Sequence, residues 1–378
     1  MGDKPLERGR AWIEIDLDAL AHNLADIRSG IPESCEIMAV VKANAYGHGI
    51  EGIVSRMVNE GIKSFAVATV IEGEELRKFL SDEEILVMGY THPDDAFWLS
   101  KYDLTQLVVD GIHAKALNNT GNKIKVHAAI DTGMHRLGIE ASNLTDIESI
   151  FNYRNLTVTG VATHLSSPDS MSKADIAFTN AQMAKFFTVV KTLKEKGYDV
   201  GKLHAQSSYG IYNHPDIKCD YVRPGIMLYG VLSIHEETKI TTDLLPVLSL
   251  KAIIAQVRWI KAGENVSYGR SYTAEKPTKI ATVSAGYADG IPRQMSGKGG
   301  MCIVRGRRVP IIGRICMDMI ILDVTDIEDV NAGDIATIIG KDGNEEIRCE
   351  EIAEAAGTIT NDVLSGFGAR LPRIYING

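Results

Sequence analysis

A lysine stands where an apolar run of the chain stops. In the segment AVVKANAYGHG, residues 39–49, three apolar residues lead directly to Lys42, and a turn-forming stretch with Tyr46 follows. A buried ammonium group is costly unless it is paired, deprotonated or covalently used. The ordinary alternative is a lysine that snorkels to the surface, but the apolar residues before it do not favour that reading. The segment therefore predicts a lysine with a chemical role.

Further polar groups that could do chemistry follow apolar runs later in the chain. They are Arg136 within DTGMHRLGI, His164, the pair Ser207 and Ser208, and the segment RPGI with Arg223, Gly225 and Ile226. A lysine opposite an anion-binding set is suited to a Schiff base with a phosphorylated aldehyde cofactor. Backbone N–H groups beside a glycine, together with hydroxyl groups, can bind the phosphate. A single histidine at a strand end is more often a satisfied polar group, so the prediction depends on all these residues meeting at one place.

Eight short β-branched runs alternate with helix-like segments in the first part of the chain. The expected strands are 37–43, 64–70, 84–90, 104–110, 123–131, 156–164, 202–207 and 221–228, and clear helical segments are 72–80, 142–151 and 174–196. Apolar strands that alternate with helices indicate a parallel sheet covered by helices. Eight such units predict an α/β fold of the TIM (β/α)8 barrel type, with an open doubly wound sheet as the alternative. In such a barrel the polar residues named above would converge on the mouth at the carboxyl ends of the strands.

The pattern changes after about residue 240. Strand-like runs at 248–260, 279–284, 301–304, 308–312, 319–324 and 335–340 are joined by turn signals. This predicts a mainly-β C-terminal domain over 243–378, after a barrel over 11–242. The stretch 11–15 is a further strand-like run, and residues 1–10 are a candidate addition to the β domain.

Composition limits the classes of protein that fit. The chain has 378 residues, of which 45% are hydrophobic and 24% charged, a composition typical of a globular protein with two domains. A formal charge of −9 argues against a nucleic-acid surface. No apolar run approaches the length of about 20 residues that spans a bilayer, and no signal-peptide core is visible. Five cysteines without paired spacing indicate free thiols, and we expect a cytoplasmic location.

Six segments together resemble one known family. AVVKANAYGHG, DTGMHRLGI, VRPGIMLYG, VSYGRSY, GYADGIPR and GRICMDM follow one another as the motifs of the alanine racemase family do. The resemblance covers nearly the whole chain. It implies a TIM barrel followed by a β domain, a homodimer with shared active sites, and the cofactor pyridoxal 5′-phosphate (PLP). It further implies racemisation of small amino acids that feed cell-wall peptide precursors.

The resemblance also implies roles for single residues. Lys42 would carry PLP and act as the base on one face of the substrate, and Tyr268 would act on the other face. In this family the tyrosine reaches the barrel mouth of the second subunit, and His164 and Arg223 match the network that tunes it. Arg223 would also contact the pyridine nitrogen of the cofactor. Without the other motifs, Tyr268 would be read as an aromatic that packs on a sheet.

Arg136, Met317 and Asp318 match residues that lie near the substrate carboxylate in the family. Asp318 has an equal alternative as a turn carboxylate that caps backbone N–H groups. Many members carry a carbamylated lysine where this chain has Ala129, so Arg136 needs another orienting group, such as chloride. The segment 204–208 also departs slightly, with Gln206 where the family usually has asparagine.

The departure with the largest consequence is Asn361, in GTITNDVLS, where the family usually has a tyrosine that bounds the substrate pocket. A carboxamide opens volume and adds a donor and an acceptor. A hydroxymethyl side chain gains from this and a methyl group does not. We therefore expect serine to be used at least as well as alanine, as in the racemase domain of the vancomycin-resistance serine racemases, which follows a membrane domain. The alternatives are an alanine racemase with little serine activity, a non-catalytic PLP-binding protein, and a decarboxylase or aldolase on the related barrel.

Overall fold

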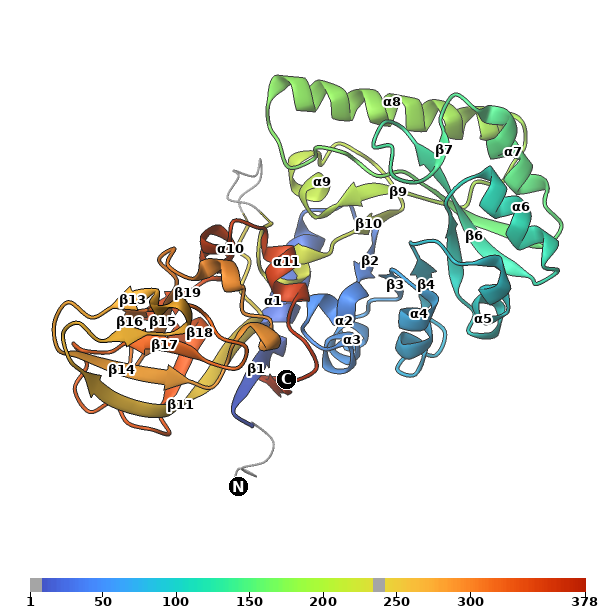
Figure 1. Cartoon of the computed structure of the whole chain (residues 1–378). Helices are drawn as coiled ribbons and strands as arrows, with labels where there is room; N and C mark the ends of the chain where they lie inside the picture. The colour runs from blue at the N-terminus through green and yellow to red at the C-terminus, as the bar shows by residue number, and fades with distance from the viewer. Residues whose placement is uncertain (1–8, 234–241) are drawn as a thin grey trace.

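A closed barrel of parallel strands forms the first part of the chain (Figure 1). The computed structural model describes residues 9–233 and 242–378. Within these ranges the barrel has eight strands, β2 (Glu36–Val40), β3 (Ser64–Val67), β4 (Glu84–Val87), β5 (Thr105–Val108), β6 (Ile124–Asp131), β8 (Leu156–Ala162), β9 (Lys202–Ser207) and β10 (Tyr221–Arg223). Each strand pairs in parallel with the next, and β5 pairs with β6 to close the barrel. The predicted TIM barrel is confirmed.

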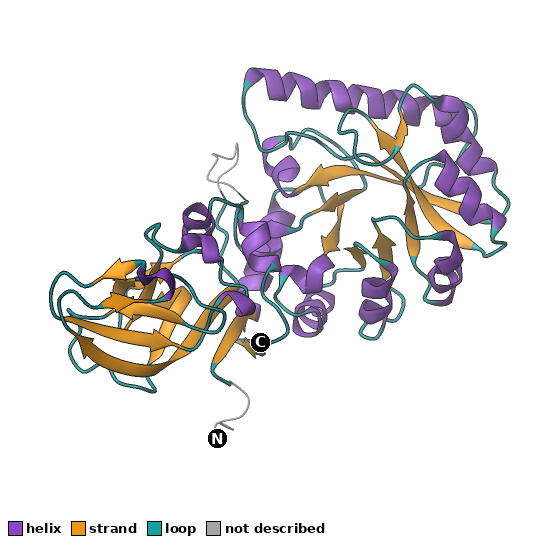
Figure 2. Ribbon diagram, viewed as in Figure 1, coloured by secondary structure: helices purple, strands orange, loops and turns teal. Residues whose placement is uncertain are grey.

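Helices cover the outside of the barrel, as Figure 2 shows. They are α1 (Leu17–Ser29), α3 (Ile50–Asn59), α4 (Val70–Arg77), α5 (Ala96–Lys101), α6 (Gly111–Asn119), α7 (Leu144–Asn152), α8 (Lys173–Glu195) and α9 (Ser208–Asn213). Polar residues cap several of their N-termini. Asp16 accepts from two backbone N–H groups of α1, Thr69 forms a capping box with Glu72 at α4, and Ser172 caps α8.

A second sheet is built around one long strand, β11 (Leu248–Ile260). The other strands of this domain are β14 (Thr278–Val283), β15 (Met301–Val304), β16 (Arg307–Pro310), β17 (Ile320–Asp323), β18 (Ile335–Asp342), β19 (Glu345–Ile347) and β20 (Arg373–Ile376), with a separate pair β12 (Asn265–Val266) and β13 (Tyr272–Thr273). The predicted C-terminal mainly-β domain is confirmed.

The N-terminal strand crosses between the two parts of the molecule. β1 (Ala11–Asp16) pairs antiparallel with β11 and parallel with β20, although the sequence boundaries had placed it in the barrel segment 11–242. Of residues 1–10, the predicted addition to this domain, 1–8 lie outside the described residues. A contiguous apolar core contains residues of both domains, so the two sheets are firmly joined.

Two short helices, α10 (Cys349–Ala356) and α11 (Thr360–Ser365), lie between the β domain and the barrel (Figure 1). The backbone of α11 approaches the turn after β2 so closely that a Cβ atom on Gly47 would lie 2.1 Å from the carbonyl oxygen of Leu364. This close approach brings Asn361 to the barrel mouth. Among the described residues, no helix combines the length and the apolarity needed to cross a membrane.

Candidate active site

The expected strand 37–43 places Lys42 at the end of the first barrel strand, but in the structure Lys42 lies outside that strand. β2 ends at Val40, and Lys42 begins a separate turn, α2 (Lys42–Tyr46). From Ala43 to Tyr46 the φ angles lie between 51° and 54°, which is the left-handed helical region. A left-handed turn cannot continue a strand, and for non-glycine residues it costs about 1–2 kcal/mol per residue. The strand prediction was wrong here because strand propensity carries no information about a left-handed turn of non-glycine residues.

Contacts from other elements hold the left-handed turn in place. The Glu72 carboxylate accepts from the backbone N–H of Ala43 at 2.7 Å, and the Asn44 side chain accepts from the N–H of Ile50 at 2.9 Å. At the far end, the guanidinium group of Arg373 donates to the carbonyl of Gly47 at 2.8 and 3.0 Å. Strain of this kind persists where the surroundings over-determine the conformation, and it clusters at functional sites.

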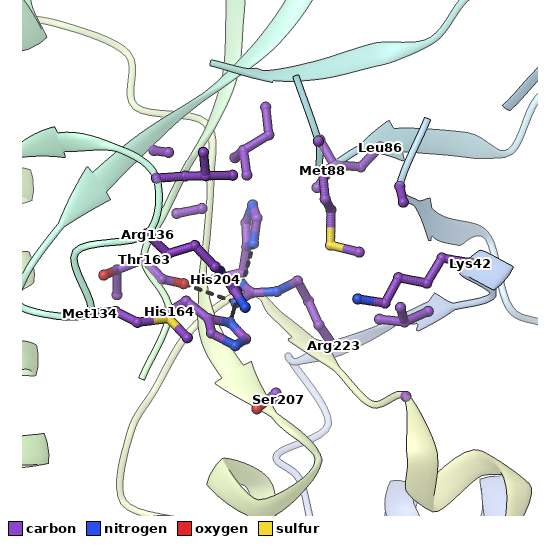
Figure 3. Close-up of a pocket in the computed structure, with 18 of the residues that line it drawn as sticks. Lys42, Leu86, Met88, Met134, Arg136, Thr163, His164, His204, Ser207 and Arg223 are labelled. Atoms are coloured by element: carbon purple, nitrogen blue, oxygen red, sulfur yellow. Dashed lines mark hydrogen bonds between the residues drawn. The ribbon is translucent and has the colours of Figure 1, made fainter. Parts of the chain in front are cut away.

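A cavity of about 380 Å³ opens at the barrel mouth beside Lys42 (Figure 3). Nine of the residues that the sequence singled out line it: Lys42, Tyr46, Arg136, His164, Ser207, Arg223, Gly225, Ile226 and Asn361. They come from the carboxyl ends of several barrel strands and from α11. The convergence that the barrel prediction required is therefore present.

Arg223 is buried in the floor of this cavity. Its guanidinium group donates to Nδ1 of His204 at 2.5 Å, to Nδ1 of His164 at 3.1 Å, and to the carbonyl oxygens of Thr163 and Ala205 at 2.9 and 3.1 Å. Figure 3 shows the arginine between the two imidazole rings, with Lys42 reaching toward it. Burial, reinforced by Arg223, lowers the pKa of His164 to about 3, so this histidine is neutral near pH 7.

The ammonium group of Lys42 is also destabilised. Burial and the nearby Arg136 lower its pKa, and Glu72 opposes them. Arg136 itself makes no hydrogen bond or ion pair that the structure records with another described residue, and Ala129 lines the cavity near it. The structure thus leaves the guanidinium group of Arg136 available to an anion.

A small polar cradle lies on one side of the cavity. A Cβ atom on Gly225 would stand 2.7 Å from the hydroxyl oxygen of Tyr46, so only glycine allows this approach. Burial raises the pKa of Tyr46 to about 12, which keeps the phenol a hydrogen-bond donor. Ser207 and Ser208 line the same cavity, and Ser208 accepts from the N–H of Gly225 at 3.0 Å. Hydroxyl and N–H donors around a glycine fit a phosphate group.

Asn361 adds a further sign of a ligand. Its Oδ1 atom is buried and has no hydrogen-bond partner, and the residue lines the cavity. A buried polar atom without a partner is costly and needs an explanation. A polar ligand in the cavity would supply the missing partner.

Three of the predicted site residues lie elsewhere. Tyr268, Met317 and Asp318 line a separate hollow of about 430 Å³ on the β domain. The Tyr268 side chain is 69% exposed, and Met317 is exposed as well. Within this chain they do not meet Lys42 in one cavity.

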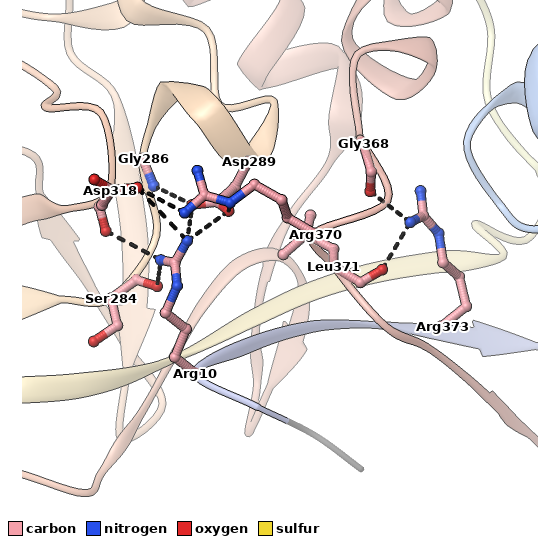
Figure 4. A network of polar contacts seen from close by, with 9 residues as sticks. All are labelled: Arg10, Ser284, Gly286, Asp289, Asp318, Gly368, Arg370, Leu371 and Arg373. Atoms are coloured by element: carbon pink, nitrogen blue, oxygen red, sulfur yellow. Dashed lines mark hydrogen bonds and ion pairs between the residues drawn. The ribbon is translucent and has the colours of Figure 1, made fainter. Parts of the chain in front are cut away.

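Two arginines hold the loop of Asp318 (Figure 4). Arg370 donates to the Asp318 carboxylate at 2.7 Å, and Arg10 donates to its backbone carbonyl at 3.1 Å. Arg10 also binds both carboxylate oxygens of the buried Asp289, at 2.7 and 3.0 Å. Gly286 lets the segment GYADGIPR pack on the loop, since a Cβ atom there would lie 2.4 Å from the carbonyl oxygen of Cys316. Asp318 is thus held by arginines.

Family models and relatives match the whole described fold. The N-terminal domain of alanine racemase matches residues 15–233, and its C-terminal domain matches residues 247–375. An amino-acid racemase of Enterococcus faecalis is 43% identical over 363 residues, which are 96% of this chain and 51% of that protein. A serine/alanine racemase of Enterococcus gallinarum is 40% identical over 363 residues, with the same two coverages. The chain spans about half the length of these two relatives.

A solved alanine racemase of Bartonella henselae, with covalently bound PLP, matches with a TM-score of 0.85 and 30% identity. The match covers 97% of this chain and 100% of that one. The chain belongs to the alanine racemase family, a PLP-dependent family, and the resemblance read from the sequence is confirmed.

Sequence reasoning missed one residue of the site, His204, which binds Arg223. His204 lies in the strand that ends at Ser207, and a reading of which side chains of that strand point into the barrel could have found it. Ser208, which the sequence placed beside Ser207 at a strand end, begins α9 and accepts a hydrogen bond from the N–H of Gly225.

Proposed function

We propose that this chain catalyses the PLP-dependent racemisation of small amino acids, with serine and alanine as substrates. The observation that carries the proposal is the cavity in which Lys42, Arg223 and His164 meet a cradle of hydroxyl and N–H groups and the partnerless oxygen of Asn361. Membership of the family supports PLP as the cofactor. The E. gallinarum relative supports serine as a substrate.

Residues of this chain fit the parts of a two-base reaction. PLP, when bound, withdraws electrons from the substrate and makes its Cα–H acidic. We assign Lys42 to move the proton on one face of Cα, since its lowered pKa favours a neutral amine. Arg223 donates hydrogen bonds to two backbone carbonyl oxygens, which stabilise its buried positive charge, and it would contact the pyridine nitrogen. The phosphate would be bound by Tyr46, Ser207, Gly225 and Ile226. Arg136 is free to bind the substrate carboxylate.

We infer that the second base comes from another copy of the chain. Tyr268, with Met317 and Asp318, is exposed on the β domain, away from the cavity that holds Lys42. We propose a homodimer in which the Tyr268 hollow of one protomer closes the barrel mouth of its partner. Tyr268 would then act on the opposite face of Cα from Lys42. A related PLP-binding protein without catalysis would have no use for such a residue.

Asn361 is the residue that we assign to substrate choice. Its free Oδ1 can accept a hydrogen bond from the hydroxyl of a serine side chain, directly or through water. Alanine offers no donor, so the oxygen stays without a partner when alanine is bound. Because a site built to bind a hydroxyl group discriminates against the analogue that lacks it, serine should be used at least as well as alanine.

We further propose a cytoplasmic enzyme whose D-serine and D-alanine enter cell-wall peptide precursors, with a contribution to vancomycin resistance. The five free cysteines are consistent with a reducing compartment.

The direct test is steady-state racemisation of L-serine and L-alanine by the native protein and by Asn361→Tyr. We expect good serine turnover in the native protein and a selective loss of serine turnover, about tenfold or more, in the variant. Asn180→Tyr, on the exposed surface of α8, is the matched control and should leave both rates unchanged. Negligible serine turnover in the native protein would leave an ordinary alanine racemase. No racemisation of either substrate by the PLP-loaded protein would favour a non-catalytic PLP-binding protein.

A further inference from the structure

A line of buried polar side chains runs from the floor of the cavity into the barrel. Arg223 donates to Nδ1 of His204, and Nε2 of His204 lies 2.8 Å from Nδ1 of His127. Nε2 of His127 lies 3.2 Å from a carboxylate oxygen of Glu84, a contact that is electrostatic rather than a well-aligned hydrogen bond. Both histidines are almost fully buried.

The barrel makes room for this line. His127 stands on β6, and its neighbour on β8 is Gly160. A Cβ atom on Gly160 would lie 2.7 Å from the imidazole ring of His127, so a larger residue would expel the ring. The pairing of β6 with β8 also shifts register at His127. Such irregularities re-aim side chains next to functional sites.

The donors and acceptors along the line can be assigned without ambiguity. A guanidinium group has only donors, so Nδ1 of His204 must be the unprotonated acceptor. Burial, and next to it Arg223, lowers the pKa of His204 well below its usual value, so the ring is neutral and carries its proton on Nε2. That N–H donates to Nδ1 of His127, which must therefore carry its own proton on Nε2. This last N–H faces Glu84.

Glu84 ends the line near solvent. It opens β4, at the amino ends of the barrel strands, and its side chain is 23% exposed. The Tyr221 hydroxyl donates to its second carboxylate oxygen at 3.1 Å, and Ser64 donates to Tyr221 at 3.4 Å. Burial alone would raise the pKa of Glu84, but His127, Tyr221 and the charge of Lys125 lower it. Glu84 is therefore ionised near neutral pH and can balance the buried charge of Arg223.

We propose that His204, His127 and Glu84 form a relay of positioning residues that fixes the orientation and the charge of Arg223, the residue that would contact the pyridine nitrogen of the cofactor. All its hydrogen bonds point away from Arg223 and toward the carboxylate, so the relay acts as an extended counter-ion. At the cavity end of the relay the facing charged groups are Arg223 and, beyond it, Arg136. At the Glu84 end the facing charged group is Lys125. His164, which follows β8, contacts Arg223. The proposal rests on the proposed role of Arg223.

The first test reads the tautomers directly. We would label histidine with ¹⁵N in the PLP-loaded protein and measure the ring nitrogen shifts of His127 and His204 near pH 7. The relay predicts that both rings are neutral, with the proton on Nε2. A proton on Nδ1 of either ring, or a doubly protonated ring, would overturn it. This measurement needs no turnover, so it stands or falls separately from the racemase activity.

The second test removes the charge of Glu84 and keeps its shape. In Glu84→Gln we expect kcat to fall about tenfold with little change in KM. A loss of this size is typical when a residue that orients a reactive group is changed. The pH midpoint of the PLP absorption band should shift in the same variant, and Glu84→Asp should restore it in part. Glu36→Gln is the matched control, since Glu36 opens β2, two strands away in the same barrel, and pairs with Lys202 on the surface. If Glu84→Gln and Glu36→Gln have the same absorption pH profile, or if Glu84→Gln lowers only the thermal midpoint, the relay has no role at the site.

Discussion

At the scale of single residues, the cavity collects more positive than negative charge. Lys42, Arg136 and Arg223 line it, and the one carboxylate among its lining residues, Asp131, is bound by His135 at 3.0 Å. Cations gathered in a partly buried site stabilise an anionic ligand. PLP and an amino-acid carboxylate both supply negative charge, so the charge balance of the cavity agrees with the proposed function.

His48 gives a prediction for the pH dependence of stability. Burial lowers its pKa from 6.5 to about 4, and its Nδ1 lies at hydrogen-bond distance from the carbonyls of Ala45 and Tyr46 in the left-handed turn. Between these two pH values the unfolded chain binds more protons than the folded chain, so stability rises with pH. The full contribution, about 3 kcal/mol, is present above pH 6.5 and is lost as the pH falls toward 4.

Urea unfolding from pH 7 to pH 4 checks this prediction. The native protein should lose more stability over this window than His48→Asn, which cannot titrate there. His92→Asn, at an exposed histidine, should follow the native curve. Parallel curves for the native protein and His48→Asn would show that His48 does not hold the turn as a neutral ring.

At the scale of elements, the turn α2 stores backbone strain next to the reactive lysine. Its residues 43–46 have left-handed φ angles without a glycine among them, and contacts from Glu72 and Arg373 hold both of its ends. The turn sets the direction in which the Lys42 side chain leaves the backbone. Its strain therefore serves the geometry of the cavity.

Glycine substitutions should change the free energy of unfolding in opposite directions in this turn and in a regular helix. Ala43 is exposed and has a φ of 53°, so Ala43→Gly should raise the free energy of unfolding by about 1 kcal/mol, because glycine adopts this region without penalty. Ala177→Gly, at an exposed position of the regular helix α8, should lower it by about 1 kcal/mol. Denaturant titration of both variants measures the signs. If both substitutions destabilise the protein equally, the turn carries no such strain.

The elements show what sequence reasoning can and cannot reach. Apolar runs separated by helical segments predicted every barrel strand, because a strand buried on both faces must be apolar throughout. Most of the predicted strands ran past their true ends at the barrel mouth, as at 37–43 against β2, since the polar turns there are shaped by tertiary contacts such as Arg373 to Gly47. The predicted strands 123–131 and 202–207 end where β6 and β9 end. His204 was missed for a related reason. A residue that acts by supporting another, as His204 supports Arg223, has a signal only once the strands are closed into a barrel.

At the scale of the whole molecule, the segment 370–373 contacts both the loop of Asp318 on the β domain and the turn that follows Lys42. Arg370 binds Asp318 on the β domain, and Arg373, three positions later, binds Gly47 at the end of the lysine turn. The β domain is therefore fixed relative to its own barrel, with Tyr268 exposed on it. A rigid chain with its two proposed bases in different hollows cannot complete a two-base site alone. We therefore propose that a second copy does so.

The measurement that tests this account most directly is complementation between two inactive variants. Lys42→Ala and Tyr268→Phe should each lose nearly all racemase activity. Co-expressed so that mixed dimers form, they should recover about a quarter of the native activity, because half the dimers are mixed and each mixed dimer has one intact site. Co-expression of Lys42→Ala with the double variant is the control and should recover none. If the mixed dimers form but activity stays at the level of the single variants, Lys42 and Tyr268 do not share a site across two chains, and the account is contradicted.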